Sequence, residues 1–244
     1  SQGRHAQARA DSITNPRWRN LLAQCVYQRT EVINMQKQII ALTLLLALCA
    51  QADEKGFQKI FNGKDLTGWA GPVDNYQAVD GTLRCKPGKG GTIYTTEVYG
   101  DFVVRMEILL PKGGNNGLAI RYPGKGDTAY VGMCELQVLD NTSPKYAKLH
   151  PAQYHGSAYG MFPAKRGHLK KPGEWNTQEV TVKGSTIKVV LNGETILDCD
   201  LSKVEKSMAP LAKYKGRTRK EGHFGFAGHG AAVAFRNVHI KRLK

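Results

Sequence analysis

The chain has 244 residues, of which 41% are hydrophobic, 27 are Gly and 10 are Pro, so it can bury a core in one or at most two globular domains rich in turns. Its 35 Lys and Arg exceed its 20 Asp and Glu, which gives a net charge of +15. No solenoid repeat or low-complexity tract is present, which excludes repeat architectures.

The first recognisable signal begins at Met35. A lysine, an apolar run from Ile39 to Leu48 and the small-x-small pattern AQA at 50–52 are typical of a secretory signal peptide. The run of about ten residues is too short to cross a bilayer as a mature helix, so we expect no stable membrane insertion. The sequence therefore predicts a signal peptide over 35–52, cleavage after Ala52 and a periplasmic or secreted location.

Two alternatives remain in this region. Cys49 would suit a lipoprotein signal, although Leu48 before it is bulky where such signals carry a small residue. Residues 1–34 are rich in arginine and have neither apolar periodicity nor turn chemistry, so we interpret them as an over-extended N-terminus that precedes the true initiator Met35. A basic functional arm is the alternative interpretation.

From Phe57 onward the pattern is that of β-strands. Apolar residues alternate with polar or small ones in DFVVRMEILLP (101–111), NNGLAIRY (115–122) and CELQVLDN (134–141). Further strands are expected in TQEVTVKG (177–184), in STIKVVLNGETILD (185–198), whose Asn192-Gly193 indicates a hairpin turn, and in AFRNVHIKRL (234–243). We therefore predict an all-β fold, an antiparallel two-sheet sandwich or jelly roll.

The first three strands would share a polar face if they were neighbours in one sheet. That face would carry Arg105, Glu107, Arg121, Glu135 and Gln137, with Gly117 and Ala119 leaving room among them. Arg, Glu and Gln form bidentate hydrogen bonds with hydroxyls and carboxylates, so such a face suits a polar ligand. The alternative is an ordinary solvated face whose charges pair across strands.

Basic stretches and cysteines add weaker signals. KRGHLKK (165–171) and KYKGRTRK (213–220) could hold nucleic acid or an acidic polysaccharide, or could simply be solvated loops. Because no nucleic-acid reader motif is present and export is expected, we predict no nucleic-acid partner. Cys85, Cys134 and Cys199 lack zinc-ligand spacing and can form at most one disulfide.

Six segments, in order and at ordinary spacing, resemble the 3-keto-disaccharide hydrolase domain family. They are FNGKDLTGW (61–69), YGDFVVRMEILLPKGGNNGLAIR (99–121), ELQVLDN (135–141), KPGEWNTQEVTVKG (171–184), LNGE (191–194) and HGAAVAFRNVHIK (229–241). The resemblance implies one domain over 57–244, a concanavalin A-like jelly roll and, as in exported bacterial relatives, hydrolysis or lysis of 3-keto-glycosides. The chain departs from the family pattern at GFAGHG (225–230), where Gln and Asp would precede the His-Gly pair.

The chemistry that the resemblance implies can be matched to residues. A ketone at C3 acidifies the C2 proton, so a carboxylate can remove it and the C1 aglycone can leave by elimination, with water adding later. We predict Glu135 as the base, with Glu107 as second choice, and Arg121 as the partner of the enolate oxygen. Tyr159 or His229 would protonate the leaving oxygen.

The remaining candidates would bind substrate. Arg105, Glu107 and Gln137 belong to the predicted polar face, and His155 lies on a loop that could cover it. Each histidine could instead be a structural residue. Glu107, Glu135 and His229 could hold a divalent metal ion, although no metal spacing motif and no nucleotide cofactor motif are present.

Two other classes of function remain as alternatives. A lectin-like, non-catalytic carbohydrate-binding module would use the same face, and an adhesive module would hold acidic glycans on its basic loops. An enzyme requires a carboxylate whose loss abolishes turnover while binding survives, which distinguishes these classes. The sequence leaves the aglycone, the choice between lyase and hydrolase, and the oligomeric state open.

Overall fold

The computed structural model describes residues 24, 27–32, 34–36 and 56–244. The described residues before 37 are helical and exposed. The predicted signal peptide over 35–52 lies outside the described residues except for 35 and 36. Residues 56–244 form one compact unit. Among the described helices, none is long and apolar enough to cross a membrane.

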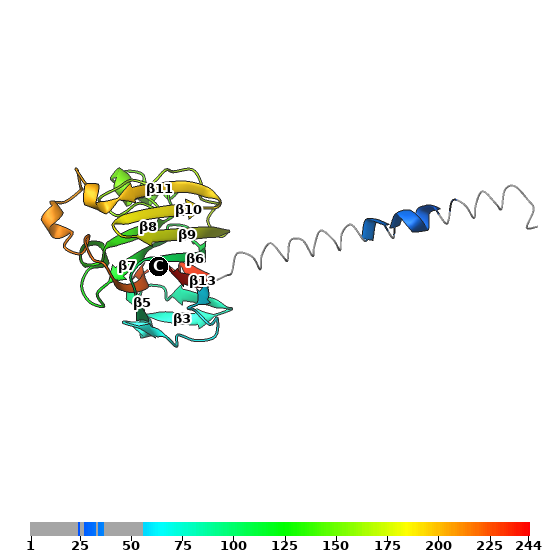
Figure 1. Cartoon of the computed structure of the whole chain (residues 1–244), viewed down its shortest axis with the longest axis horizontal. Coiled ribbons are helices and arrows are strands. Elements are labelled where there is room, and N and C mark those ends of the chain that lie inside the picture. The colour runs from blue at the N-terminus through cyan, green and yellow to red at the C-terminus, as the bar shows by residue number, and fades with distance from the viewer. Residues whose placement is uncertain (1–23, 25–26, 33, 37–55) are drawn as a thin grey trace, which may run out of the picture. The chain divides into compact units, whose positions relative to one another are not determined.

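Residues 56–244 form two antiparallel sheets (Figure 1), so the predicted all-β sandwich is confirmed. The eight-stranded sheet has the order β11-β10-β9-β6-β13-β4-β3, and β1 also pairs with β13. Its strands are β1 (Gln58–Lys59), β3 (Tyr76–Val79), β4 (Thr82–Cys85), β6 (Phe102–Leu109), β9 (Trp175–Lys183), β10 (Thr186–Leu191), β11 (Glu194–Asp200) and β13 (Ala234–Arg242).

The five-stranded sheet has the order β2-β5-β12-β7-β8. Its strands are β2 (Trp69–Ala70), β5 (Gly90–Tyr99), β12 (Gly222–His229), β7 (Asn115–Tyr122) and β8 (Cys134–Leu139). Short helical segments connect the strands: η1 (Val73–Asn75), α3 (Thr128–Val131), η2 (Pro144–Tyr146), η3 (Pro151–Gln153), η4 (Leu201–Lys203) and η5 (Leu211–Lys213).

One hydrophobic core fills the space between the sheets. The apolar members of the alternating strands are buried in it, for example Val104 on β6 and Leu136 on β8, both 0% exposed. The ring of Phe226 on β12 stacks at 3.8 Å on Phe235 of β13, which belongs to the other sheet. Burial of these apolar faces drives the two sheets together.

The predicted hairpin between β10 and β11 is also confirmed. Leu191 pairs with Glu194, so Asn192 and Gly193 alone form the connection. Their φ angles of 51° and 91° lie in the left-handed region that a two-residue type I′ turn requires.

The predicted single polar face across three successive strands is wrong. β7 and β8 are neighbours in the five-stranded sheet, but β6 lies in the eight-stranded sheet between β9 and β13. The chain changes sheets between Leu109 and Asn115, at the turn that contains Gly113 and Gly114. Alternation along a strand requires one face to be buried, and either sheet of the sandwich satisfies that requirement.

Candidate active site

The floor of a cleft lies on the open face of the five-stranded sheet. Glu135 on β8 pairs with Ala119 on β7, and Gln137 pairs with Gly117, so these two polar side chains share a face as predicted. On the other side of β7, Ala119 pairs with Gly225 of β12 and Gly117 pairs with Ala227, so the same face continues onto β12. The small residues of the floor are Gly117 and Ala119 on β7 and Gly225 and Ala227 on β12. They leave space above the sheet that polar side chains enter.

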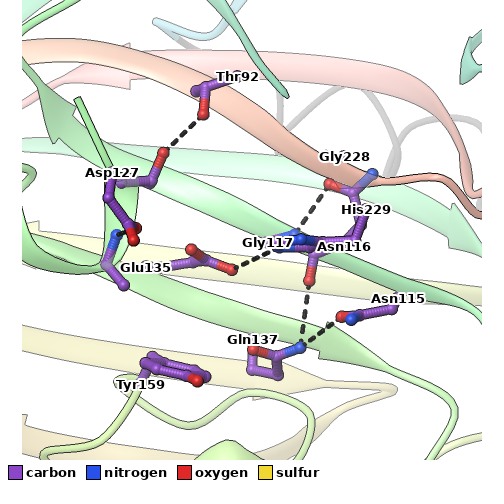
Figure 2. A network of polar contacts seen from close by, with 12 residues as sticks. Thr92, Asn115, Asn116, Gly117, Asp127, Glu135, Gln137, Tyr159, Gly228 and His229 are labelled. Atoms are coloured by element: carbon purple, nitrogen blue, oxygen red, sulfur yellow. Dashed lines mark hydrogen bonds and ion pairs between the residues drawn. The ribbon is translucent and has the colours of Figure 1, made fainter. Parts of the chain in front are cut away.

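Gly117 determines where the Glu135 carboxylate lies. A Cβ atom at position 117 would overlap Oε1 and Cδ of Glu135. Because Gly117 has no side chain, the Glu135 side chain lies over β7 and approaches His229 on β12 (Figure 2). Glu135 Oε1 and His229 Nε2 are 3.5 Å apart. A carboxylate and an imidazole are thus brought together across an intervening strand.

The pair has an asymmetric environment. The Glu135 side chain is 6% exposed, whereas that of His229 is 48% exposed and can be reached from solvent. The hydrogen bond to Glu135 raises the pKa of His229 above its ordinary value of 6.5, burial opposes the shift, and the charges of Glu135 and Asp127 add to it. The site therefore favours a protonated imidazole beside a buried carboxylate.

A cavity of about 190 Å³ lies beside this pair. It is lined by polar and aromatic side chains and by three aliphatic ones: Asn115, Asp127, Ala129, Tyr130, Glu135, Gln137, Leu139, Tyr146, Leu149, Gln153, Tyr159 and His229. Gln137 Nε2 donates to Asn115 Oδ1 at 2.7 Å. The cavity therefore combines an acid-base pair with oriented amide groups, as a site for a small polar ligand requires.

Tyr159 lines the same cavity from the loop that follows β8. Its backbone N–H donates to the Glu135 carbonyl at 2.9 Å, and its hydroxyl oxygen accepts a hydrogen bond from Gln153 Nε2 at 2.9 Å. Burial raises the pKa of Tyr159, so the hydroxyl keeps its proton. Among the described residues no group accepts that proton, which leaves it available to a ligand.

Asp127 is a site residue that sequence reasoning missed. It is the N-cap of α3, where Oδ1 accepts from the Ala129 N–H at 3.0 Å. Its only sequence signal is that of an ordinary helix cap, because its proximity to Glu135 and His229 depends on how the loop folds back. Asn115 and Gln153 were also missed, since a strand end and a short helical turn look the same with or without a cleft beside them.

Arg121 does not reach the cleft, which corrects the prediction that it contacts an enolate oxygen. Ile120 and Arg121 of β7 together stand opposite Phe224 of β12, and Arg121 has φ 48°. This β-bulge re-aims the side chain into the protein, where it is 1% exposed. Its guanidinium donates to the carbonyls of Gly100, Gly184 and Arg219 and to Asp101 Oδ1, at 2.7 to 2.9 Å. Burial lowers the pKa of Arg121, and Asp101 opposes the shift.

Arg105 and Glu107 lie on the outer face of the eight-stranded sheet, whereas the cleft floor belongs to the five-stranded sheet. Arg105 Nε pairs with Glu179 Oε2 at 2.6 Å, and Glu107 Oε2 accepts from Arg236 Nη2 at 2.6 Å. Arg236 also stacks on the ring of Trp175 at 4.1 Å. The predicted substrate-binding roles of Arg105 and Glu107, and of Glu107 as an alternative base, are therefore contradicted by their position.

His155 is a core residue and does not cover the site. Its ring is 1% exposed, its Nδ1 accepts from the Leu139 N–H at 3.2 Å, and its Nε2 lies 2.9 Å from Gln178 Oε1. Because Nδ1 accepts, Nε2 carries the proton and donates to Gln178. Burial lowers the pKa of His155 to about 4. Both ring nitrogens are used inside the protein, which contradicts a substrate-binding role.

The set Glu107, Glu135 and His229, considered as possible metal ligands, is not brought together. In the part of the chain that the structure describes, no group of three or more His, Cys, Asp or Glu side chains could hold a metal ion. The three cysteines Cys85, Cys134 and Cys199 are free thiols.

Comparison with known proteins places these features in context. Residues 56–241 match the family model of the 3-keto-alpha-glucoside-1,2-lyase-like domain. A 3-keto-disaccharide hydrolase of Bacteroides thetaiotaomicron is 30% identical over 231 residues, which cover 78% of this chain and 80% of the relative. Two crystal structures of candidate glycosyl hydrolases from Parabacteroides distasonis ATCC 8503 have TM-scores of 0.69. The first is 27% identical, and its alignment covers 77% of this chain and 99% of the chain in that crystal structure. The other is 26% identical, with coverages of 80% and 97%.

Proposed function

Because the chain belongs to the 3-keto-alpha-glucoside-1,2-lyase-like domain family, we propose that it cleaves glycosides whose C3 hydroxyl has been oxidised to a ketone. The observation that carries the proposal is the pair of Glu135 and His229 at the floor of a polar cavity, with Oε1 and Nε2 3.5 Å apart. A base and an acid in reach of one small ligand are what elimination next to a ketone needs. The name of the Bacteroides relative supports the same substrate class.

Elimination begins with Glu135. Its ionised carboxylate removes the proton on C2, and the electron pair of the C2–H bond moves toward C3 to form an enolate. The Tyr159 hydroxyl keeps its proton and donates a hydrogen bond to the C3 oxygen, where negative charge develops. Tyr159 thus takes the role that the sequence assigned to Arg121. It is an uncharged donor whose raised pKa keeps it protonated.

His229 completes the elimination. The enolate electrons form the C1–C2 double bond as the bond from C1 to the aglycone oxygen breaks. That oxygen receives the proton of the His229 imidazolium, which the neighbouring carboxylates favour. The step leaves Glu135 protonated, His229 neutral, and an unsaturated keto sugar in the cavity.

The same two groups can complete hydrolysis. Neutral His229 removes a proton from water as its oxygen adds to C1, and Glu135 returns its proton to C2. The two residues then recover their starting protonation states. Release of the unsaturated sugar before water adds would make the net reaction a lyase reaction, so the two outcomes differ only in which step follows elimination.

The sequence pattern over 35–52 supports a location for this activity. We propose that the enzyme acts after export, in the periplasm or outside the cell, with a glycoside or oligosaccharide as its substrate. N-terminal sequencing of the exported protein should find Asp53 or a close neighbour as the first residue. A mature protein that retains residues 1–34 would contradict the proposal of a signal peptide.

The test of the mechanism compares two identical chemical changes. Glu135→Gln keeps shape and hydrogen bonding but cannot accept a proton, so turnover of a 3-keto-glucoside should fall by roughly 10²-fold or more. Glu107→Gln makes the same change on the outer face and should leave turnover near that of the unaltered protein. The unoxidised glucoside should react far more slowly, because its C2 proton is not acidic.

Two results would overturn the proposal. Equal rates on the oxidised and unoxidised glucosides would indicate glycosidase chemistry by paired carboxylates. Binding of the 3-keto-glucoside with no turnover would indicate a lectin-like module, which is the alternative class of function.

A further inference from the structure

A second cavity lies on the opposite side of the Glu135–His229 pair. It has a volume of about 330 Å³ and shares Asp127, Glu135 and His229 with the first cavity. We call the first cavity the inner chamber and the second the outer chamber. Figure 2 shows Thr92 of the outer chamber on one side of the pair, and Asn115, Gln137 and Tyr159 of the inner chamber on the other.

Most hydrogen-bonding groups of the outer chamber are used by one another. Thr92 Oγ1 and Thr128 Oγ1 are 2.6 Å apart, so one hydroxyl donates to the other and a single hydroxyl proton is left over. The Tyr122 hydroxyl donates to the Gly126 carbonyl at 2.8 Å. Its other lining residues are Gly91, Ala227 and Gly228, which have small side chains or none. Apart from the three shared residues, the outer chamber therefore presents shape more than hydrogen-bonding capacity.

The inner chamber differs in this respect. Gln137 donates from its amide nitrogen to the amide oxygen of Asn115. The other ends of the two amides, the acceptor Gln137 Oε1 and the donor Asn115 Nδ2, are not used in this bond. These two ends have no partner among the described residues, and neither does the hydroxyl proton of Tyr159. The inner chamber thus offers acceptor and donor groups in fixed positions around the base.

We propose that the inner chamber holds the 3-keto ring and the outer chamber holds the aglycone, and that the enzyme selects the keto ring by its hydroxyl groups but the aglycone mainly by its size. The scissile C1–oxygen bond then lies at the shared pair, between the two chambers. A site that hydrogen-bonds a substrate hydroxyl strongly rejects analogues lacking it, whereas a site that provides only space discriminates weakly. The substrate class is therefore 3-keto-glycosides with varied aglycones, sugar or aryl. This inference rests on the proposed function.

A substrate panel tests both halves of the proposal. The panel holds 3-keto-glucosides with methyl, benzyl and glucosyl aglycones, all of which leave as alcohols rather than as the more acidic phenols, and the C4 epimer of each. Across matched aglycones kcat/KM should stay within about tenfold, whereas epimerisation at C4 should lower it by roughly 10²-fold or more. A preference for one matched aglycone above 10²-fold, or tolerance of the epimer, would overturn the proposal. Failure to cleave any 3-keto-glycoside would instead refute the proposed function itself.

A pair of variants tests the assignment of the chambers. Thr92→Phe would fill the outer chamber from β5, so the loss in kcat/KM should grow with aglycone size and be largest for the glucosyl substrate. Thr96→Phe makes the same change on the same strand, at an exposed residue that lines neither chamber, and should not change the order of substrates. Circular dichroism would verify that both variants fold.

The reciprocal variant addresses the inner chamber. Gln137→Met removes the free acceptor while keeping the length of the side chain, and it should lower kcat/KM by the same factor for every aglycone. An aglycone-dependent loss in Gln137→Met, or an equal loss on all substrates in Thr92→Phe, would overturn the assignment.

Discussion

The two sheets of the protein each carry acidic and basic side chains on their open faces, but they arrange them differently. On the outer face of the eight-stranded sheet, Arg105 is the direct cross-strand partner of Glu179, and Glu107 is that of Arg236. On the cleft floor, the direct partner of Glu135 is Ala119. Glu135 instead approaches His229, which lies on a strand two places away.

This difference separates structural from functional charge. Directly opposed charges satisfy each other across a pair of strands and leave little capacity for a ligand. A carboxylate opposite a small residue has space above it, and its approach to an imidazole keeps a base and an acid available together. Small residues beside a buried carboxylate are therefore a better indicator of a site than a high density of charge.

Arg121 belongs to neither face, and its removal should have the largest effect. Arg121→Ala leaves three carbonyls without their donor and leaves Asp101 with only the Gly184 N–H, so the free energy of unfolding should fall by roughly 3–5 kcal/mol, as when one partner of a buried ion pair is removed. Arg121→Lys should cost less because a positive charge remains. Denaturant unfolding measures both. Turnover per folded molecule should stay normal. A large loss of turnover at unchanged stability would indicate that Arg121 takes part in catalysis after all.

Gly117→Ala would break the arrangement of the cleft floor directly. The new methyl group must displace the Glu135 carboxylate, which is a flexible side chain, so the fold should survive. Misplacement of the base should lower kcat by about 10- to 100-fold. Gly100→Ala is the matched control, because its Cβ would meet only ordinary contact at 3.7 Å. Normal kcat in Gly117→Ala would show that Glu135 does not need this position.

The titration of His229 distinguishes its partner Glu135 from Glu107 on the outer face. Since Glu135 raises the pKa of His229 above 6.5, the protonated imidazole contributes stability that is fully present below pH 6.5 and is lost as pH rises through the folded-state pKa. The alkaline limb of turnover should also lie above pH 6.5. Glu135→Gln should shift the imidazole titration, followed by NMR, toward lower pH, and Glu107→Gln should not. An identical titration in Glu135→Gln would contradict the pairing.

The smallest effect is expected on the outer face. A double-mutant cycle over Glu107→Gln and Arg236→Gln should give a coupling of about 0.2–1 kcal/mol in the free energy of unfolding, because both side chains are partly exposed. Turnover of the 3-keto-glucoside should be unchanged in all three variants. A loss of turnover in any of them would show that the outer face contributes to function.

The sequence was a good guide to each strand taken alone. Alternation in CELQVLDN correctly placed Glu135 and Gln137 on one face, and the same pattern in NNGLAIRY placed Gly117 and Ala119 beside them. The alternating strands by themselves predicted the correct sandwich fold, and the family resemblance, carried by segments spread over most of 57–244, implied the same fold. Alternation failed at Arg121, because a β-bulge adds one residue and reverses the side of the strand on which the next side chain lies.

What the sequence determined by itself is local. A period of two fixes which side chains of a strand lie together, and apolar members must face a core. Only the tertiary structure decided that β6 joins the other sheet, that Glu135 reaches His229 across β7, and that Asp127 comes beside them. Most of these contacts join residues far apart in the chain, and they form because all the strands together bury one core. No single stretch of sequence contains that information.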